Sequence, residues 1–515
     1  MFSSTQRRHI PILILFAINL VAGFILLPDY GISWDEPLFY DYANHIQQAY
    51  TPQAFTPGFN FDSVYGASAE DHKFYGPAYL LLAKPAVAIW QSVGLGFYQA
   101  WHWVNFLFFQ VGVLILYLFL LRLMEPLPAA IGAAFMAWQP VFWGHAYINP
   151  KDIPFLVFVL ASTYTGYRAV DSPVGKPTIR WMAIFGIVLG LTSAVRVIGP
   201  VAWLVVALYA MLARKWQKLG WLIAAGVLAI PMMIIAWPYL WADPINNFIQ
   251  VLRHMSNNPT ELAVLFNGQI FRANQMPISY IPKMLLLMLT EPTWVLIAAG
   301  EVYLWMGIRN SHRDENSTIA LQTLLPFTML FLLLISYILF TRPAVYDGFR
   351  HFLFITPILF FLPAMVFGWL SGKKTKSWLF ATIAIVSLLP GIVGIFRSHP
   401  YEYNYYNQLT GGQPGAMRLY ENDYWLTCYR PALLWFRKNH TGEQLYIQRE
   451  LPLAKAYDIA IDLAEPGKGN GLPTGAYLLT HVRANLDQRS IFRKEPVVVS
   501  FGLPGADICS IKQVK

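Results

Sequence analysis

The sequence predicts an all-α polytopic membrane protein with about eleven transmembrane helices and a small α/β domain at its C-terminus on the outer face. Hydrophobic residues make up 56% of the 515-residue chain and charged residues only 13%, whereas a typical soluble domain has roughly 25% charged residues. Apolar stretches close to the length of about 20 residues that crosses a bilayer recur until residue 397 and then stop. The net charge of +9 does not indicate a nucleic-acid partner, because the basic residues are spread over short connections and not gathered on one face.

We expect the apolar stretches to cross the membrane because each has or approaches the usual length of about 17 to 25 residues. The stretches are 10–27, 101–121, 129–143, 153–169, 181–194, 197–212, 221–237, 284–307, 319–339, 352–370 and 378–396. Residues 398–515 instead alternate short strand-like segments with Gly, Pro and charged residues. We therefore predict a transmembrane domain over 1–397, with outer loops 28–101 and 239–283, and a soluble outer-face domain over 398–515.

The basic residues predict the orientation of the spans. If Arg7 and Arg8 lie in the cytoplasm, alternate connections become cytoplasmic, and these connections carry an excess of Lys and Arg. They hold Arg122; Arg168, Lys176 and Arg180; Arg214, Lys215 and Lys218; Arg309 and Arg313; and Lys373, Lys374 and Lys376. The long loops and the C-terminal domain then face the periplasm or exterior of an inner (plasma) membrane protein.

Both cysteines of the chain, Cys428 and Cys509, fall in the predicted outer domain. An oxidising compartment allows a disulfide there, but two cysteines can also share a domain by chance, so pairing stays open. The chain has no nucleotide-binding glycine loop, CxxC pair, HExxH or nucleophile elbow. This argues against a motor, a zinc enzyme or a serine hydrolase.

Trp34-Asp35-Glu36 directly follows the first apolar stretch. Carboxylates just beyond a membrane face can act as a general base or a cation ligand for a substrate that arrives through the lipid. We take Asp35 and Glu36 as candidate catalytic residues. Alternatively, the pair only marks a solvated loop after a helix.

Asp152 is a second acidic candidate, because Asn149-Pro150-Lys151-Asp152 lies between two spans and places a carboxylate at the same membrane face as Asp35. Asp152 also precedes a predicted span, so it could be only a helix N-cap.

These features resemble the glycosyltransferase C superfamily, specifically its family 39 branch, which holds protein O-mannosyltransferases and lipid A aminoarabinose transferases. The resemblance rests on the Asp-Glu pair, the multi-span body and the outer C-terminal domain, and on four further segments: 144–152, 237–241, 346–351 and 399–407. It implies inverting transfer of a sugar from a polyprenyl-phosphate carrier to a glycan, lipid or protein acceptor on the outer face, in contact with membrane lipids.

The resemblance also implies roles for the candidate residues. Asp35 is the carboxylate best placed to take the proton of an acceptor hydroxyl, and the departing lipid phosphate needs cationic or hydrogen-bonding partners. The candidates on the outer side are Lys73, Lys151, Arg196, Arg350 and His351. Arg196 could instead be a snorkelling side chain, Arg350 and His351 could anchor a span or pair with Asp347, and Lys73 matches no family motif.

Trp34, Tyr239, Trp241 and Tyr346 are candidate contacts of the donor or acceptor, because aromatic faces stack on sugar rings and prenyl chains. An aromatic belt at the membrane interface is the alternative explanation for each of them. Some members of the superfamily bind a divalent cation, and Asp35 with Asp152 could offer oxygen ligands to Mg²⁺ or Mn²⁺. Two carboxylates from separate loops do not by themselves define a metal site.

A transporter or flippase of lipid-linked sugars is the alternative function, with membrane carboxylates that carry protons. The sequence shows no repeat of two matching halves, and its acidic candidates gather on one side, which favours an enzyme. A non-catalytic scaffold with the same fold is a third alternative.

Overall fold

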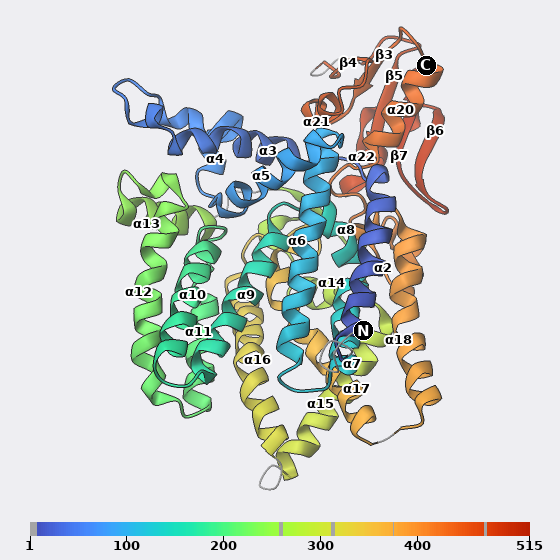
Figure 1. Ribbon diagram of the computed structural model, residues 1–515. Helices are drawn as coiled ribbons and strands as arrows, with labels where there is room; N and C mark the ends of the chain where they lie inside the picture. Colours follow the sequence, from blue (N-terminus) through green and yellow to red (C-terminus); the bar gives the residue numbers. More distant parts are fainter. Residues whose placement is uncertain (1–7, 257–260, 311–314, 374, 468–470) are drawn as a thin grey trace.

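The computed structural model describes residues 8–256, 261–310, 315–373, 375–467 and 471–515 (Figure 1). Of the basic residues used to predict orientation, Arg7, Arg313 and Lys374 lie outside this part of the chain. Within it, six helices are long and apolar enough to cross a membrane. They are α2 (Ile10–Leu26), α6 (Phe97–Leu120), α9 (Asp152–Asp171), α12 (Leu219–Ile235), α16 (Glu315–Thr341) and α18 (Ser377–Ser398). The chain is an integral membrane protein.

The other predicted stretches form shorter or broken helices. Three of these helices are α10 (Lys176–Ser193), α11 (Val201–Leu212) and α17 (Ile358–Gly372). Stretch 129–143 divides into α7 (Pro126–Ala137) and α8 (Pro140–Ile148), and stretch 284–307 divides into α14 (Tyr280–Met288) and α15 (Glu291–Asn310), bent by 109°. All eleven predicted stretches therefore lie on helices, but two of them are not straight spans.

The side chain of Gln139 bridges the two breaks. Pro140 cannot continue a helix from the preceding turn, and Gln139 before it is extended. The Gln139 amide nitrogen donates to the hydroxyls of Thr290 (3.1 Å) and Thr293 (2.8 Å), and its oxygen accepts from the Thr290 backbone amide (3.0 Å). Breaks inside a membrane domain are tolerated when the freed polar groups find partners in the protein, and here each break supplies partners for the other.

Shorter helices and the sheet domain gather at one end of the bundle, opposite the end at which α6 and α17 finish (Figure 1). The loop after α2 contains α3 (Glu36–His45), α4 (Ala69–His72) and α5 (Ala78–Ser92). The loop after α12 contains α13 (Pro244–Ser256) and a hairpin of β1 (Ala263–Phe266) and β2 (Gln269–Arg272). We call this the loop end of the bundle.

The C-terminal part of the chain forms a five-stranded sheet in the order β4-β3-β5-β7-β6. Its strands are β3 (Gln444–Ile447), β4 (Asp462–Ala464), β5 (Tyr477–His481), β6 (Val497–Leu503) and β7 (Ala506–Gln513), and α20 (Tyr429–Asn439) precedes them. β3 pairs in parallel with β4 and β5, whereas β7 pairs antiparallel with β5 and β6. A disulfide between Cys428 and Cys509 joins the start of α20 to β7. The predicted class, a helical membrane protein with a small C-terminal α/β domain, is confirmed.

Residues 399–427 connect the last span to this sheet and are largely buried. They pack against α8, where Gly144 lies so close to the backbone of Tyr403 that a Cβ on Gly144 would collide with it. The segment therefore joins the sheet domain firmly to the helices beneath it, and it brings Glu421 and Tyr424 to the site described next.

Candidate active site

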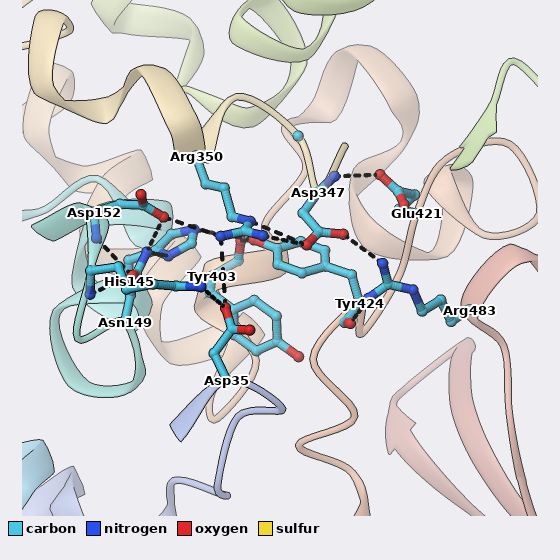
Figure 2. Close-up of polar contacts among 12 residues, drawn as sticks. Asp35, His145, Asn149, Asp152, Asp347, Arg350, Tyr403, Glu421, Tyr424 and Arg483 are labelled. Carbon is cyan, nitrogen blue, oxygen red and sulfur yellow. Dashed lines mark hydrogen bonds and ion pairs between the residues drawn. The ribbon is translucent and has the colours of Figure 1, made fainter. Parts of the chain in front are cut away.

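Asp35 lies at the loop end of the bundle, immediately before α3. Its carboxylate forms an ion pair with the ammonium of Lys151 at 2.8 Å, and the guanidinium of Arg350 lies 3.8 Å away (Figure 2). The Asp35 side chain is 25% exposed. It is the more exposed of the two predicted acidic sites, since the Asp152 side chain is 3% exposed.

Asp152 begins α9 and is almost fully buried. It pairs with Arg196, and its other oxygen accepts from Arg350 (3.3 Å) and from the Asn149 amide (3.0 Å). The side-chain oxygen of Asn149, in turn, accepts from the backbone amides of Lys151 and Asp152. Asn149 thus satisfies the free amides at the start of α9, and the carboxylate of Asp152 is left to pair with arginines.

Arg350 connects the acidic residues. It is 4% exposed, and its guanidinium contacts Asp35, Asp152 and Asp347, the last at 3.0 Å. Asp347 also pairs with Arg483 at 3.0 Å. Figure 2 shows the resulting row of alternating charges, from Asp152 through Arg350 and Asp347 to Arg483. This alternation offsets the desolvation free energy of burying the charges, because each carboxylate in the row contacts a guanidinium and each guanidinium contacts a carboxylate.

The charges around Asp35 decide its protonation. Burial acts to raise the pKa of Asp35, but the positive charges of Lys151 and Arg350 outweigh it and hold this pKa below its ordinary value. Asp35 is therefore a carboxylate at neutral pH.

A cavity of about 400 Å³ opens beside this row of charges. Four of the predicted phosphate-binding residues line it: Lys151, Arg196, Arg350 and His351. Tyr346 lines it as well, and the rest of its wall is mostly apolar, with Val195, Val197, Ile198, Leu252, Met255, Leu334 and Phe354. Burial and the neighbouring positive charge of Arg350 depress the pKa of His351 well below its ordinary value, so this imidazole is neutral. The cavity thus combines a cationic end with an apolar wall.

Other predicted residues lie away from this cavity. Lys73 pairs with Glu70 at 3.2 Å and lies over the ring of Phe74. The hydroxyl of Tyr239 donates to Gln250, and Trp241 packs among the rings of Tyr50, Phe55 and Phe61. Neither Tyr239 nor Trp241 lines the cavity within the described part of the chain.

Glu36 is fully buried, although it neighbours Asp35. Its carboxylate accepts from the Ser33 backbone amide (2.5 Å) and the Tyr40 hydroxyl (2.8 Å), and it pairs with His102 at 2.8 Å. These contacts fix the turn that holds Asp35 against Lys151 and Arg350.

Several residues that complete the cluster carry no sequence signal for a site role. Asp347 was named only as an ion-pair partner of Arg350. Glu421, whose carboxylate accepts from the Asp347 backbone amide at 2.9 Å, lies in a segment whose role the sequence did not indicate. Arg483 follows β5 without any motif, so no local signal could have found it.

The contacts of the two predicted metal ligands do not fit a divalent cation. Among the described residues no group of three or more His, Cys, Asp or Glu side chains is arranged to hold a metal ion. Asp35 and Asp152 both face Arg350. Lys151 contacts the same oxygen of Asp35 as Arg350 does, and Arg196 contacts the other oxygen of Asp152. A metal ion between the two carboxylates would have to displace a guanidinium. Metal dependence stays a prediction, and the chemistry proposed below uses the protein's own cations.

Comparisons with known proteins agree with this architecture. Residues 88–239 match the family model of dolichyl-phosphate-mannose-protein mannosyltransferase. The crystal structure of ArnT from Cupriavidus metallidurans bound to undecaprenyl phosphate is similar over 97% of both chains, with a TM-score of 0.51 and 13% identity. The chain has the glycosyltransferase C fold. The apo state of the same ArnT has a TM-score of 0.52 at 12% identity, again over 97% of both chains. No curated protein matches the sequence. The resemblance inferred from the Asp-Glu pair and the multi-span body is confirmed.

Proposed function

We propose that the chain is an inverting glycosyltransferase that moves a sugar from a polyprenyl-phosphate carrier to an acceptor hydroxyl on the outer face of the membrane. One observation carries the proposal: the accessible carboxylate of Asp35 lies beside a cavity whose lining combines Lys151, Arg196 and Arg350 with an apolar wall. A lipid-linked sugar phosphate has this same combination of an anionic group and a hydrocarbon chain. The ArnT structure with undecaprenyl phosphate supports this donor class by analogy of fold.

In the proposed reaction the carrier phosphate binds to the cations of the cavity, and the prenyl chain follows the apolar wall. Asp35 accepts the proton of the acceptor hydroxyl while the hydroxyl oxygen attacks the anomeric carbon. The bond between that carbon and the phosphate oxygen breaks, and the carrier leaves as a lipid phosphate with one more negative charge. Lys151, Arg196 and Arg350 stabilise this charge as it develops. Attack from the face opposite the phosphate inverts the anomeric carbon.

Donor binding also makes Asp35 a better base in this scheme. A carboxylate held ionised by two cations attracts a proton weakly. The carrier phosphate competes with Asp35 for Lys151 and Arg350, since both cations line the cavity and both contact Asp35. The pKa of Asp35 therefore rises when the donor is bound, and proton transfer becomes easier in the presence of the sugar.

The outer face follows from the basic residues. Arg122, Lys215 and Lys373 lie in connections at the end of the bundle opposite the loop end, as expected for the cytoplasmic side. The loop end, with the site and the disulfide-linked sheet domain, then faces the periplasm or exterior. The acceptor is a glycan, lipid or protein of that compartment.

The test uses purified protein in lipid nanodiscs with a synthetic polyprenyl-phosphate sugar. Release of polyprenyl phosphate that depends on an acceptor and is lost in Asp35→Asn supports the proposal. Mass spectrometry of outer-envelope glycoconjugates, with and without the chain, identifies the sugar and acceptor together. Movement of the intact lipid-linked sugar between leaflets without cleavage would instead favour the transporter alternative.

A further inference from the structure

Arg483 reaches the charged row from the sheet domain. It follows β5 by two residues and is 2% exposed. One terminal nitrogen of its guanidinium donates to Asp347 at 3.0 Å, and the other donates to the backbone carbonyl of Tyr424. Figure 2 shows Arg483 and Arg350 approaching Asp347 from opposite sides. The sheet domain thus contributes a side chain to the site itself.

Asp347 is held as a bridge between the two arginines. Arg350 takes one carboxylate oxygen and Arg483 takes the other. The backbone of Asp347 has a φ of +58°, in the left-handed region that non-glycine residues rarely adopt. Its amide donates to Glu421, and the next amide, of Gly348, donates to the Tyr280 hydroxyl. These contacts restrict the conformation of Asp347. Arg483 therefore helps to fix Asp347, and Asp347 in turn holds Arg350 in position.

Arg483 also contacts the residue before Asp35. Its guanidinium lies 4.9 Å from the centre of the Trp34 ring, and that of Arg449 lies 4.6 Å from the same ring. The Trp34 amide donates to the backbone carbonyl of Trp425. Arg483 therefore contacts both Trp34, which is bonded to Asp35, and Asp347, which holds the arginine nearest to Asp35.

We propose that Arg483 is a positioning residue of the active site, delivered by the C-terminal domain, which sets the separation of Arg350 and Asp35 by holding Asp347 and Trp34. The inference rests on the proposed function and adds to it. A sheet domain that only anchored the chain would have no need of a buried arginine in the charged row, and its loss would change stability alone.

We expect the loss of Arg483 to raise the pKa of Asp35. Burial and the negative charge of Asp347 raise the pKa of Glu421 to about 7, and Arg483 opposes this rise. Without Arg483, the pKa of Glu421 rises further, so Glu421 loses its charge at neutral pH. Asp347 has one cation fewer, so it attracts Arg350 more strongly and draws it away from Asp35. Because Arg350 lowers the pKa of Asp35, this pKa rises. The acid limb of the pH profile, where Asp35 gains its proton, then moves to higher pH.

The experiment compares Arg483→Gln and Arg483→Lys with Arg493→Gln. Arg493 is exposed in the same domain, so it controls for the loss of one positive charge. In full-length protein in nanodiscs we expect Arg483→Gln to lower kcat by about 10- to 100-fold, as for loss of a charged hydrogen-bond partner. The KM for the donor should rise by less than kcat falls, since Arg483 does not line the donor cavity and Arg350, although shifted, remains in its lining. Arg483→Lys should restore part of kcat and move the acid limb back, and Arg493→Gln should match the parent.

Hydrogen exchange gives a second measurement that does not depend on activity. Faster exchange of the backbone amides in residues 31–36 of Arg483→Gln, but not of Arg493→Gln, supports the positioning of Trp34 and Asp35. A folded Arg483→Gln protein with parental kcat, acid limb and exchange in this segment would overturn the inference and leave the proposed function intact. Absence of transfer by the parent protein would overturn the proposed function, while the exchange comparison would still test the contact.

Discussion

Asp35→Asn is the sharpest test of the proposed mechanism. The substitution keeps the size of the side chain and removes its charge and its capacity to accept a proton. We expect turnover to fall by about 10²- to 10⁴-fold, the usual contribution of general-base catalysis, which is about 3 to 5 kcal/mol in activation free energy.

The affinity of Asp35→Asn for the donor, unlike its turnover, should not fall. Asp35 lies 2.8 Å from Lys151 and 3.8 Å from Arg350, so its removal frees both cations for the carrier phosphate. The Asp35 side chain is 25% exposed and solvent screens the pair. A partly exposed ion pair contributes up to about 1 kcal/mol, so donor affinity should be unchanged or up to about fivefold tighter.

The assay measures donor binding and sugar transfer on the same purified preparation, with Asp62→Asn as the control. Asp62 is an exposed carboxylate of the same loop and should leave both quantities at parental values. In the free parent enzyme, the lowered pKa of Asp35 keeps the base ionised when the pH falls through the ordinary range of an aspartate, so the acid limb of the pH profile of kcat/KM should lie at low pH. If Asp35→Asn bound donor and transferred sugar at the parental rate, Asp35 would not be the base, and Asp152 would be the next carboxylate to test.

Three further results are expected. Arg196→Gln and Arg350→Gln should each weaken donor binding by about 1.5 to 3 kcal/mol, the value of a charged hydrogen bond, in a direct binding assay; unchanged donor affinity in both variants would return these arginines to a structural role. Glu36→Gln should lower the melting temperature and reduce kcat less than Asp35→Asn does, because Glu36 is fully buried and holds the turn, whereas the Asp35 side chain is partly exposed; a loss of kcat as large as that of Asp35→Asn, at parental stability, would contradict this reasoning. A cysteine at Ser63, in the loop after α2, should react with an impermeant thiol reagent added from outside, and one at Ser377, which begins α18 at the opposite end, should not. The reverse labelling pattern would overturn the orientation.

Much of the membrane domain could be predicted because its requirements are local. A bilayer imposes a minimum length of apolar sequence on each span, and that length is visible in one stretch at a time. The break at Gln139 has a local cause in Pro140, but the contact that joins it to the break at Thr290 escaped prediction because it links residues about 150 positions apart. Similarly, the sequence left the pairing of Cys428 and Cys509 open, since 81 residues separate them and only the strand order brings them together.

The candidate site likewise has features that the sequence predicts and features that depend on tertiary packing. The sequence by itself determined that Asp35, Lys151 and Asp152 lie just beyond the ends of apolar stretches, because hydropathy fixes depth in the membrane. Only the tertiary structure decided which charges meet. Arg350 contacts Asp152 across 198 residues, and Arg483 contacts Asp347 across 136. A buried charge requires a partner, but burial does not specify which partner. The packing of the tertiary structure makes that choice, and it places Arg483 of the sheet domain against Asp347 and Trp34, the residue before the acidic pair.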